Sequence, residues 1–196
     1  MTTNDYQIRT RLKDKVVGIA GCGGLGSNCA VALARVGVGR LIIADFDKVE
    51  FSNLNRQYYF ADQVGKAKVN ALRDNIHRID PLIKVEIHEI ELKEDNIPVI
   101  YKDCDVIVEA FDKAEMKQMI METVFDKMPD NYLVCGSGLA GWGDNGSIGV
   151  EISGKVYIFG DGIKEVSQDY PPLAPRVGIV ANMQANQVLE ILLGKM

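Results

Sequence analysis

The chain lacks the features that mark membrane, secreted and nucleic-acid-binding proteins. No apolar run approaches the ~20 residues needed to cross a bilayer. The first residues, MTTNDY, have neither the basic nor the apolar segment of a secretory signal. Lys and Arg (22) are outnumbered by Asp and Glu (27), and the net charge of −5 gives no overall basic field for nucleic acid or an anionic surface. These absences predict a cytoplasmic protein that binds neither membrane nor nucleic acid.

Cysteine pairs, internal repeats and low-complexity tracts are also absent. The four cysteines are scattered and form no Cys-x-x-Cys pair, which argues against a structural zinc site and against a disulfide framework. A length of 196 residues suits one domain with a full hydrophobic core. We therefore expect residues 1–196 to form a single domain.

Strand and helix patterns alternate along the chain. This alternation predicts an α/β fold, Rossmann-like, with a largely parallel sheet flanked by helices. Strands are expected at 15–21, 41–44, 83–90, 105–108 and 132–135, and helices at 25–36, 65–79, 95–101, 113–127 and 175–193. Near the C-terminal third, an added antiparallel hairpin (148–152 and 156–159) follows a glycine-rich loop at 136–149, and residues 160–172 are expected to form an exposed crossover.

A glycine motif lies between the first predicted strand and the helix after it. Gly21, Gly23 and Gly26 match G-x-G-x-x-G, in which the glycines permit a tight turn, approach to a phosphate and close helix packing. The amino end of the helix adds backbone donors for phosphate. Asp45 comes at the end of the second strand, where a carboxylate can bind ribose hydroxyls. The pattern predicts an adenine nucleotide site without distinguishing mononucleotide from dinucleotide; a turn that merely permits packing is the alternative.

A dense polar segment, SNLNRQ at 52–57, follows this acid. Its guanidinium, on Arg56, is planar and permanently charged and suits a polyphosphate. Lys66 and Lys68 begin the next predicted helix, where the positive end of the helix dipole disfavours a cation unless an anion lies nearby. Lys66 equally fits a solvated face, so Lys68 is the better candidate for a phosphate ligand.

Asp112 comes just after the strand expected at 105–108, at the carboxyl edge where ligands of open α/β sheets collect. A carboxylate beside a triphosphate is a natural Mg²⁺ ligand. The alternative is an N-cap for a helix that starts at Lys113. Together with the other elements, the metal role is favoured.

Several segments of the chain resemble the ThiF/MoeB/HesA family of the ubiquitin-activating, E1-like superfamily. These are GCGGLGS (21–27), DFDKVEFSNLNRQY (45–58), GKAKV (65–69), and LAPRVG (173–178) with the helix after it. The resemblance spans roughly residues 12–194 and is nearest to short, zinc-free ThiF proteins, which adenylate the sulfur carrier ThiS of thiamin synthesis.

The resemblance implies ATP- and Mg²⁺-dependent adenylation of the C-terminal glycine carboxylate of a ThiS-like, ubiquitin-like carrier ending in Gly-Gly, by a homodimer. The implied nucleotide ligands are Gly21, Gly23, Gly24, Asp45, Ser52, Asn53, Asn55, Arg56, Gln57 and Lys68. Arg56, Lys68 and Asp112 are the implied catalytic residues, with Asp112 holding Mg²⁺. A carboxylate is already nucleophilic, so the chemistry needs charge neutralisation at phosphate and no general base.

The chain departs from the family pattern in three places. Larger relatives carry two Cys-x-x-Cys pairs for zinc, and none exists here. Some relatives carry a reactive cysteine in their crossover segment. Residues 143–172 of this chain contain no cysteine, so we predict adenylation without a covalent thioester step. Many relatives also carry an arginine before the first strand that reaches a partner's ATP site. Here only Arg9 and Arg11 are available, and whether either acts across a dimer stays open.

Three other functions remain as alternatives. Within the family these are activation of a molybdopterin-type carrier and adenylation-driven dehydration of a modified tRNA base. From another class, an NAD-dependent oxidoreductase accounts for the glycine motif but leaves residues 52–57 unexplained.

Overall fold

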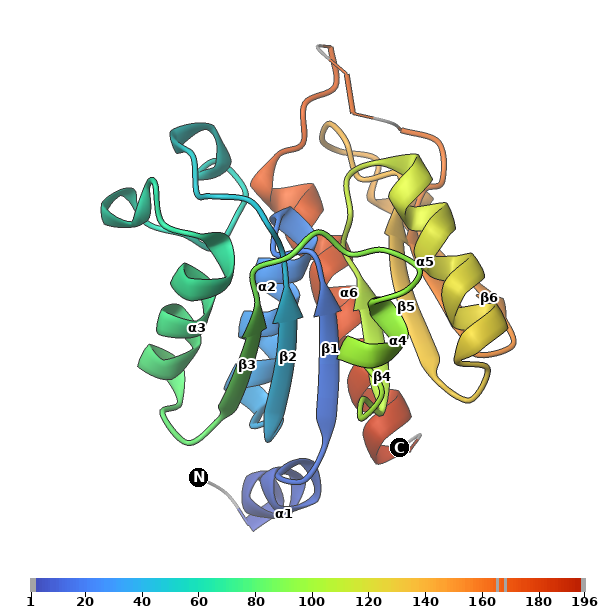
Figure 1. Ribbon diagram of the computed structural model, residues 1–196. Coiled ribbons are helices and arrows are strands. Elements are labelled where there is room, and N and C mark those ends of the chain that lie inside the picture. Colours follow the sequence, from blue (N-terminus) through green and yellow to red (C-terminus); the bar gives the residue numbers. More distant parts are fainter. Residues whose placement is uncertain (1–2, 165, 168, 195–196) are drawn as a thin grey trace.

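The protein is built around one seven-stranded sheet with the order β3-β2-β1-β4-β5-β7-β6 (Figure 1). The computed structural model describes residues 3–164, 166–167 and 169–194, so two residues of the expected crossover, 165 and 168, lie outside it. Strands β1 to β5 and β7 run parallel, and β6 pairs antiparallel with β7. The Rossmann-like prediction with an added hairpin is confirmed. The strands are β1 Val16–Ala20, β2 Arg40–Ala44, β3 Lys84–His88, β4 Val106–Glu109, β5 Tyr132–Ser137, β6 Gly149–Ser153 and β7 Val156–Gly160.

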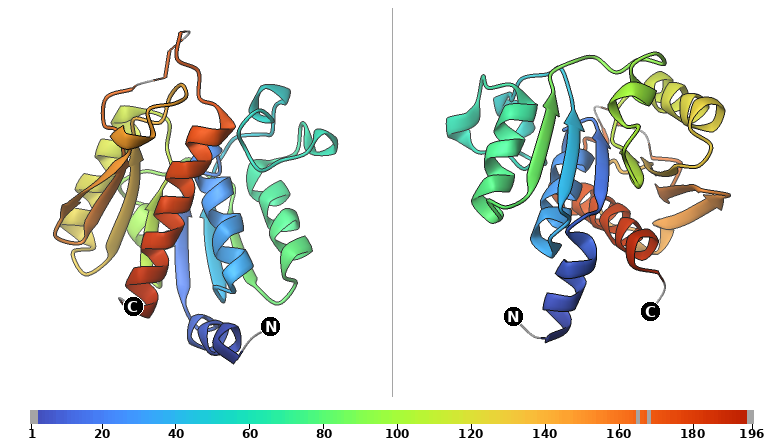
Figure 2. Two further views of the ribbon diagram at one scale, coloured as in Figure 1. Left: turned by 180° about the vertical axis from the view of Figure 1, so that it is seen from behind. Right: turned by 60° about the horizontal axis from the view of Figure 1, so that its bottom comes forward.

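Helices cover both faces of the sheet (Figure 2). One hydrophobic core joins α2, α3 and α6 to the sheet, and a second core on the other face joins α4 and α5 to it. The α-helices are α1 Thr3–Leu12, α2 Gly24–Val36, α3 Lys68–Ile79, α4 Ile97–Ile100, α5 Ala114–Lys127 and α6 Ala174–Leu193; short 3₁₀ turns are Phe51–Asn53, Ala61–Gln63 and Asn145–Ser147. None of the described helices has the length and apolar character to span a bilayer.

The central strands carry long apolar runs because both of their faces are covered. In β2, Leu41 and Ile43 enter the first core while Ile42 enters the second. Strands that are covered on both faces have sequences that are continuous hydrophobic runs. Burial of each side chain of this size stabilises the folded state by about 1.5–3 kcal/mol. The edge strand β6 is exposed along its whole length, which is why its sequence is more polar.

Among the differences from the sequence-based expectation, three have a clear physical reason. Helix α1 was not predicted, because only Leu12 of its apolar side chains is buried. Helix α3 begins at Lys68 and not at Gly65, whose φ of +89° belongs to the preceding turn. Helix α5 begins at Ala114 with Lys113 in the N-cap position, so the N-cap interpretation of Asp112 is wrong.

The topology predicts a ligand crevice at one edge of the sheet. Strand order reverses between β1 and β4, and open α/β folds bind ligands outside the carboxyl ends of the strands at such a point. The loops that follow β1, β2, β4 and β5 all rise from this edge, at the top of Figure 1, whereas α1 lies at the opposite edge.

Candidate nucleotide-binding site

The glycine turn connects β1 to α2 beside the end of β4. Gly21 has a φ of +97°, and a Cβ there would lie 2.9 Å from the carbonyl oxygen of Ala110. A Cβ on Gly26 would lie 1.9 Å from the carbonyl oxygen of Gly21. Only glycine fits both places, and Gly23 then caps the amino end of α2. The first N–H groups of a helix have no partner within it, so the turn offers donors and partial positive charge to an anion.

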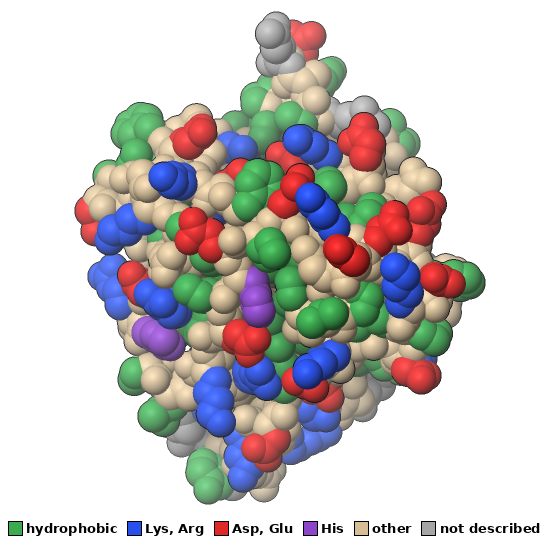
Figure 3. All heavy atoms as spheres, in the orientation of Figure 1, with side chains coloured by type: hydrophobic (Ala, Val, Ile, Leu, Met, Phe, Trp, Pro, Cys, Tyr) green, Lys and Arg blue, Asp and Glu red, His purple; other side chains and the backbone are tan. Residues whose placement is uncertain are grey.

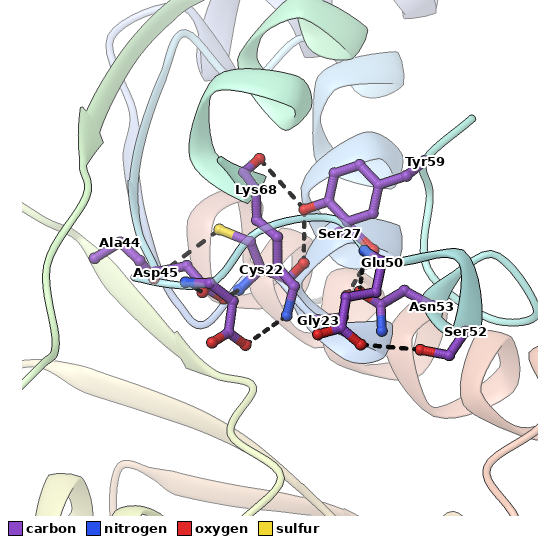
Figure 4. Close-up of polar contacts among 11 residues, drawn as sticks. Cys22, Gly23, Ser27, Ala44, Asp45, Glu50, Ser52, Asn53, Tyr59 and Lys68 are labelled. Atoms are coloured by element: carbon purple, nitrogen blue, oxygen red, sulfur yellow. Dashed lines mark hydrogen bonds and ion pairs between the residues drawn. The ribbon is translucent and has the colours of Figure 1, made fainter. Parts of the chain in front are cut away.

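Asp45 lies directly against this turn. Its carboxylate accepts the N–H of Cys22 at 2.6 Å and that of Asp47 at 2.7 Å (Figure 4). Burial raises the pKa of Asp45, while the charge of Lys68 and the two N–H bonds oppose the rise. The structure thus places the predicted ribose acid beside the glycine turn, at the end of β2.

Lys68 is the first residue of α3 and one of the most buried charged residues of the site. Its residue exposure is 6%, and its Nζ lies 2.7 Å from the carboxylate of Asp47. The Tyr59 hydroxyl donates to the carbonyl of Cys22 at 2.7 Å and lies 3.4 Å from that of Lys68. The predicted glycine turn, Asp45 and Lys68 therefore meet. The anion that the sequence leads one to expect beside Lys68 is supplied within the chain by Asp47.

The polar loop 52–57 is docked on the first turn of α2. The Asn28 amide donates to the carbonyl of Arg56 at 2.9 Å and to that of Gly24 at 2.7 Å. The Ser27 hydroxyl accepts the N–H of Tyr58 at 2.9 Å. These bonds hold the backbone of Arg56 above the amino end of α2.

The Arg56 side chain is half-buried and has only neutral partners. Its guanidinium donates to the Asn55 side chain at 2.8 Å and to the carbonyl of Ser52 at 3.2 Å. Within the described part of the chain it forms no ion pair, so its charge is uncompensated and available to an anionic ligand.

The remaining polar side chains of this loop have different surroundings. Ser52 donates to the Glu50 carboxylate at 3.1 Å, and Asn53 accepts the Glu50 N–H at 3.0 Å, so both shape the loop. Asn55 reaches the carbonyl of Pro172 at 3.4 Å. Gln57 is 8% exposed, and its Oε1 has no hydrogen-bond partner among the described residues. A buried unpaired acceptor costs about 1–3 kcal/mol, and the other amide atom of Gln57, Nε2, is the one that lies toward Gly23.

Asp112 follows β4 on the other side of the crevice. It is exposed, and its carboxylate has no hydrogen-bond or ion-pair partner among the residues that the structure describes. Within the same residues, no group of three His, Cys, Asp or Glu side chains is placed to hold a metal ion. Mg²⁺ is commonly held by one or two carboxylates together with substrate phosphates. A lone carboxylate at this edge fits an ion that arrives with the nucleotide.

A buried ion pair joins the loops on the far side of the crevice to α6. Arg176 is 2% exposed and lies 2.6 Å from the equally buried carboxylate of Asp161. It also donates to the carbonyl of Gly143 at 2.6 Å. The glycine-rich loop and the start of the crossover are thereby tied to one helix. Arg176 was not identified as important from the sequence.

Arg9 and Arg11 lie at the opposite edge of the sheet, on α1 (Figure 1). Arg9 donates to Asp80 and to the carbonyl of Arg35, each at 2.9 Å, and Arg11 donates to the carbonyl of Leu193. Neither reaches the site of its own chain, and any role across a dimer requires these contacts to break.

The sheet order and the glycine turn at the amino end of α2 define a Rossmann-like domain. Residues 3–196 match the model of the ThiF family over nearly the whole length. The chain belongs to the ThiF family.

Two curated relatives show the range of proteins to which the chain is similar. Ubiquitin-like modifier-activating enzyme 5 of Caenorhabditis elegans is 40% identical over 89 residues, which cover 45% of this chain and 20% of the relative. The probable adenylyltransferase/sulfurtransferase MoeZ of Mycobacterium tuberculosis is 39% identical over 111 residues, or 56% of this chain and 28% of the relative. The matched segments thus span less than a third of either relative.

Solved structures share the fold. The tRNA N6-threonylcarbamoyladenosine dehydratase TcdA of E. coli, in complex with AMP, has a TM-score of 0.84 at 21% identity, covering 95% of this chain and 89% of that one. The E. coli protein MccB, in complex with AMPCPP and MccA, has a TM-score of 0.74 at 19% identity, covering 98% and 64%.

Proposed function

We propose that the protein uses ATP to adenylate the C-terminal glycine carboxylate of a ubiquitin-like sulfur carrier. One observation supports this most: the uncompensated guanidinium of Arg56 and the buried ammonium of Lys68 flank a glycine turn at the amino end of α2. The family assignment and the names of the curated relatives support the same reaction class.

The proposed step is a substitution at the α-phosphorus of ATP. A carboxylate oxygen of the carrier forms the new bond to phosphorus, and the bond to the bridging oxygen of the β-phosphate breaks. Pyrophosphate leaves with that electron pair, and the carrier retains AMP as an acyl adenylate. No proton transfer is needed, so Arg56 and Lys68 act by neutralising phosphate charge.

We assign Mg²⁺ binding to Asp112. The ion, when bound with ATP, would supply further charge neutralisation on the phosphates. Asp45 would accept the ribose hydroxyls, and the Gln57 amide, whose Nε2 lies toward Gly23, would donate to the nucleotide. Gly23 and Gly24 would present backbone N–H groups to phosphate.

The carrier is proposed to approach over the glycine-rich loop between β5 and β6. Gly138, Gly141 and Gly143 have φ values of +68°, +74° and +71°, and Trp142 among them is 70% exposed. An exposed aromatic side chain beside bare backbone suits an extended glycine tail. We expect Trp142→Ala to weaken carrier binding about tenfold without changing ATP affinity. Calorimetric titration with carrier and with ATP measures the two affinities, and unchanged carrier affinity would contradict this docking route.

The sulfur carrier of thiamin synthesis, ThiS, is the proposed partner. The test is ATP–pyrophosphate exchange with candidate carriers ending in Gly-Gly. Exchange with a ThiS-type carrier alone supports ThiS as the partner. Exchange with a molybdopterin-type carrier alone shows that the partner is a carrier of that type and not ThiS. Exchange dependent on tRNA, or binding of NAD in place of ATP, overturns it.

Acidic and basic side chains are interspersed over the face shown in Figure 3, without an extended basic area.

We expect adenylation to proceed without a protein thioester. The four cysteines are buried, and burial raises the pKa of Cys29 and of Cys104 to about 12 and that of Cys22 well above its usual value. A thiol is a nucleophile only as thiolate, so none is suited to attack the adenylate. Mass spectrometry after incubation with ATP and carrier should show free enzyme and adenylated carrier. A carrier–enzyme adduct released by thiols would contradict this.

The proposal includes a homodimer. A groove of about 650 Å³ lies along α6 and β7, with Phe159, Ile179 and Met183 in its lining. Val150 and Ile152 on β6 are 45% and 61% exposed and pair across the hairpin with Phe159 and Tyr157. A second copy covering this apolar face would bury it, and sedimentation equilibrium measures the oligomeric state.

A further inference from the structure

A buried carboxylate lies directly below the segment that carries Asp112. Glu109 is the last residue of β4, and its side chain has no solvent exposure. It accepts the N–H of Phe111 at 2.6 Å, and Lys117 of α5 donates to both of its oxygens at 2.8 and 3.1 Å. The backbone immediately before Asp112 is therefore held by a side chain and not only by the sheet.

The same network joins the ends of two neighbouring strands. The Lys117 ammonium also donates to the carbonyl of Gly136 in β5 at 2.7 Å. From α6, on the other face of the sheet, the Gln184 amide donates to the carbonyls of Glu109 and Val134 at 3.0 and 3.3 Å. Side chains from both helical layers thus clamp β4 to β5 where the crevice begins.

This arrangement is costly for folding and suggests a role beyond stability. Burial raises the pKa of Glu109, and Lys117 and the Phe111 N–H oppose that rise. A buried ion pair is often replaced by apolar residues without loss of stability, whereas loss of one partner is strongly destabilising. A fully satisfied buried network does hold its members rigidly.

We propose that Glu109 and Lys117 are positioning residues that hold the Phe111–Asp112 segment where the Asp112 carboxylate can bind a divalent cation brought by ATP. The role assigned to Asp112 rests on the proposed function. The hold on the backbone does not, because it is a property of the free protein.

The decisive variant is the double substitution Glu109→Leu with Lys117→Met, which removes both charges and keeps the volume apolar. It is expected to have a thermal midpoint close to that of the wild-type protein, whereas Lys117→Met alone lowers it. Hydrogen exchange of the Phe111 amide should become at least tenfold faster in the double variant. The Mg²⁺ concentration for half-maximal pyrophosphate exchange should rise about tenfold. Lys127→Met is the matched control, because Lys127 ends the same helix and, within the described residues, bonds only the carbonyl of Glu94.

A folded double variant with wild-type Phe111 exchange and wild-type Mg²⁺ dependence overturns the proposal. A second measurement needs no variant: in the wild-type protein the Phe111 amide should exchange at least 100-fold more slowly than the exposed Asp112 amide. Equal rates overturn the hold on the backbone even if the variants do not fold. If the wild-type protein shows no pyrophosphate exchange, the proposed function fails, and amide exchange still decides whether the pair holds the segment.

Discussion

Replacing Arg56 with alanine is expected to abolish ATP–pyrophosphate exchange while leaving the fold intact. Phosphoryl-transfer enzymes lose about 10³-fold or more in rate without such an arginine. Folding should be nearly unaffected, because among the described residues the guanidinium donates only to the Asn55 side chain and the carbonyl of Ser52. Surface changes of this kind alter stability by about 0.5 kcal/mol or less.

The measurements are exchange of labelled pyrophosphate into ATP and the thermal midpoint of each protein. Arg73→Ala is the matched control, since Arg73 lies on α3 and its guanidinium bonds only its neighbour Asp74 in the part of the chain that the structure describes. It should retain full activity. Normal exchange in the Arg56 variant would refute the assignment of the polar loop to phosphate binding.

Replacing Asp112 with asparagine is expected to reduce exchange about 100-fold at millimolar Mg²⁺, equivalent to ~2.7 kcal/mol of barrier. The asparagine keeps an oxygen but loses the charge that Mg²⁺ prefers. Part of the rate should return as Mg²⁺ is raised. Stability should be unchanged, because the carboxylate is exposed and has no partner within the described residues.

A Mg²⁺ titration of the exchange rate distinguishes this effect from a general loss of activity. Asp126→Asn, an exposed acid on α5, is the control and should behave like the wild-type protein. If the Asp112 variant followed the wild-type titration curve, Asp112 would not be the metal ligand.

The sequence could predict the sheet edge at which the site lies because parallel strands bring their carboxyl ends together. Gly21 directly follows β1, Asp45 directly follows β2, and Lys68 is the first residue of α3. The hydrophobic patterns of these elements are strong, so the predicted fold already brings the three residues to one edge of the sheet. The contact of Lys68 with Asp47 was not predicted, since it depends on how α3 begins after the Gly65 turn.

The buried pairs could not be predicted from local patterns. Glu109 ends an apolar strand, and its partner Lys117 lies on a helix whose surface is largely charged. Arg176 lies in the first turn of α6, where the helix dipole disfavours a cation, and only the folded crossover brings Asp161 to it. Such partners are defined by tertiary packing and carry no periodic signal.

The only tryptophan of the chain is the exposed side chain in the glycine-rich loop, Trp142. Its indole therefore serves as a single native optical probe on the proposed docking route. Emission intensity recorded during a titration with carrier would follow docking in the unmodified protein, free of the background that indoles elsewhere contribute in most enzymes.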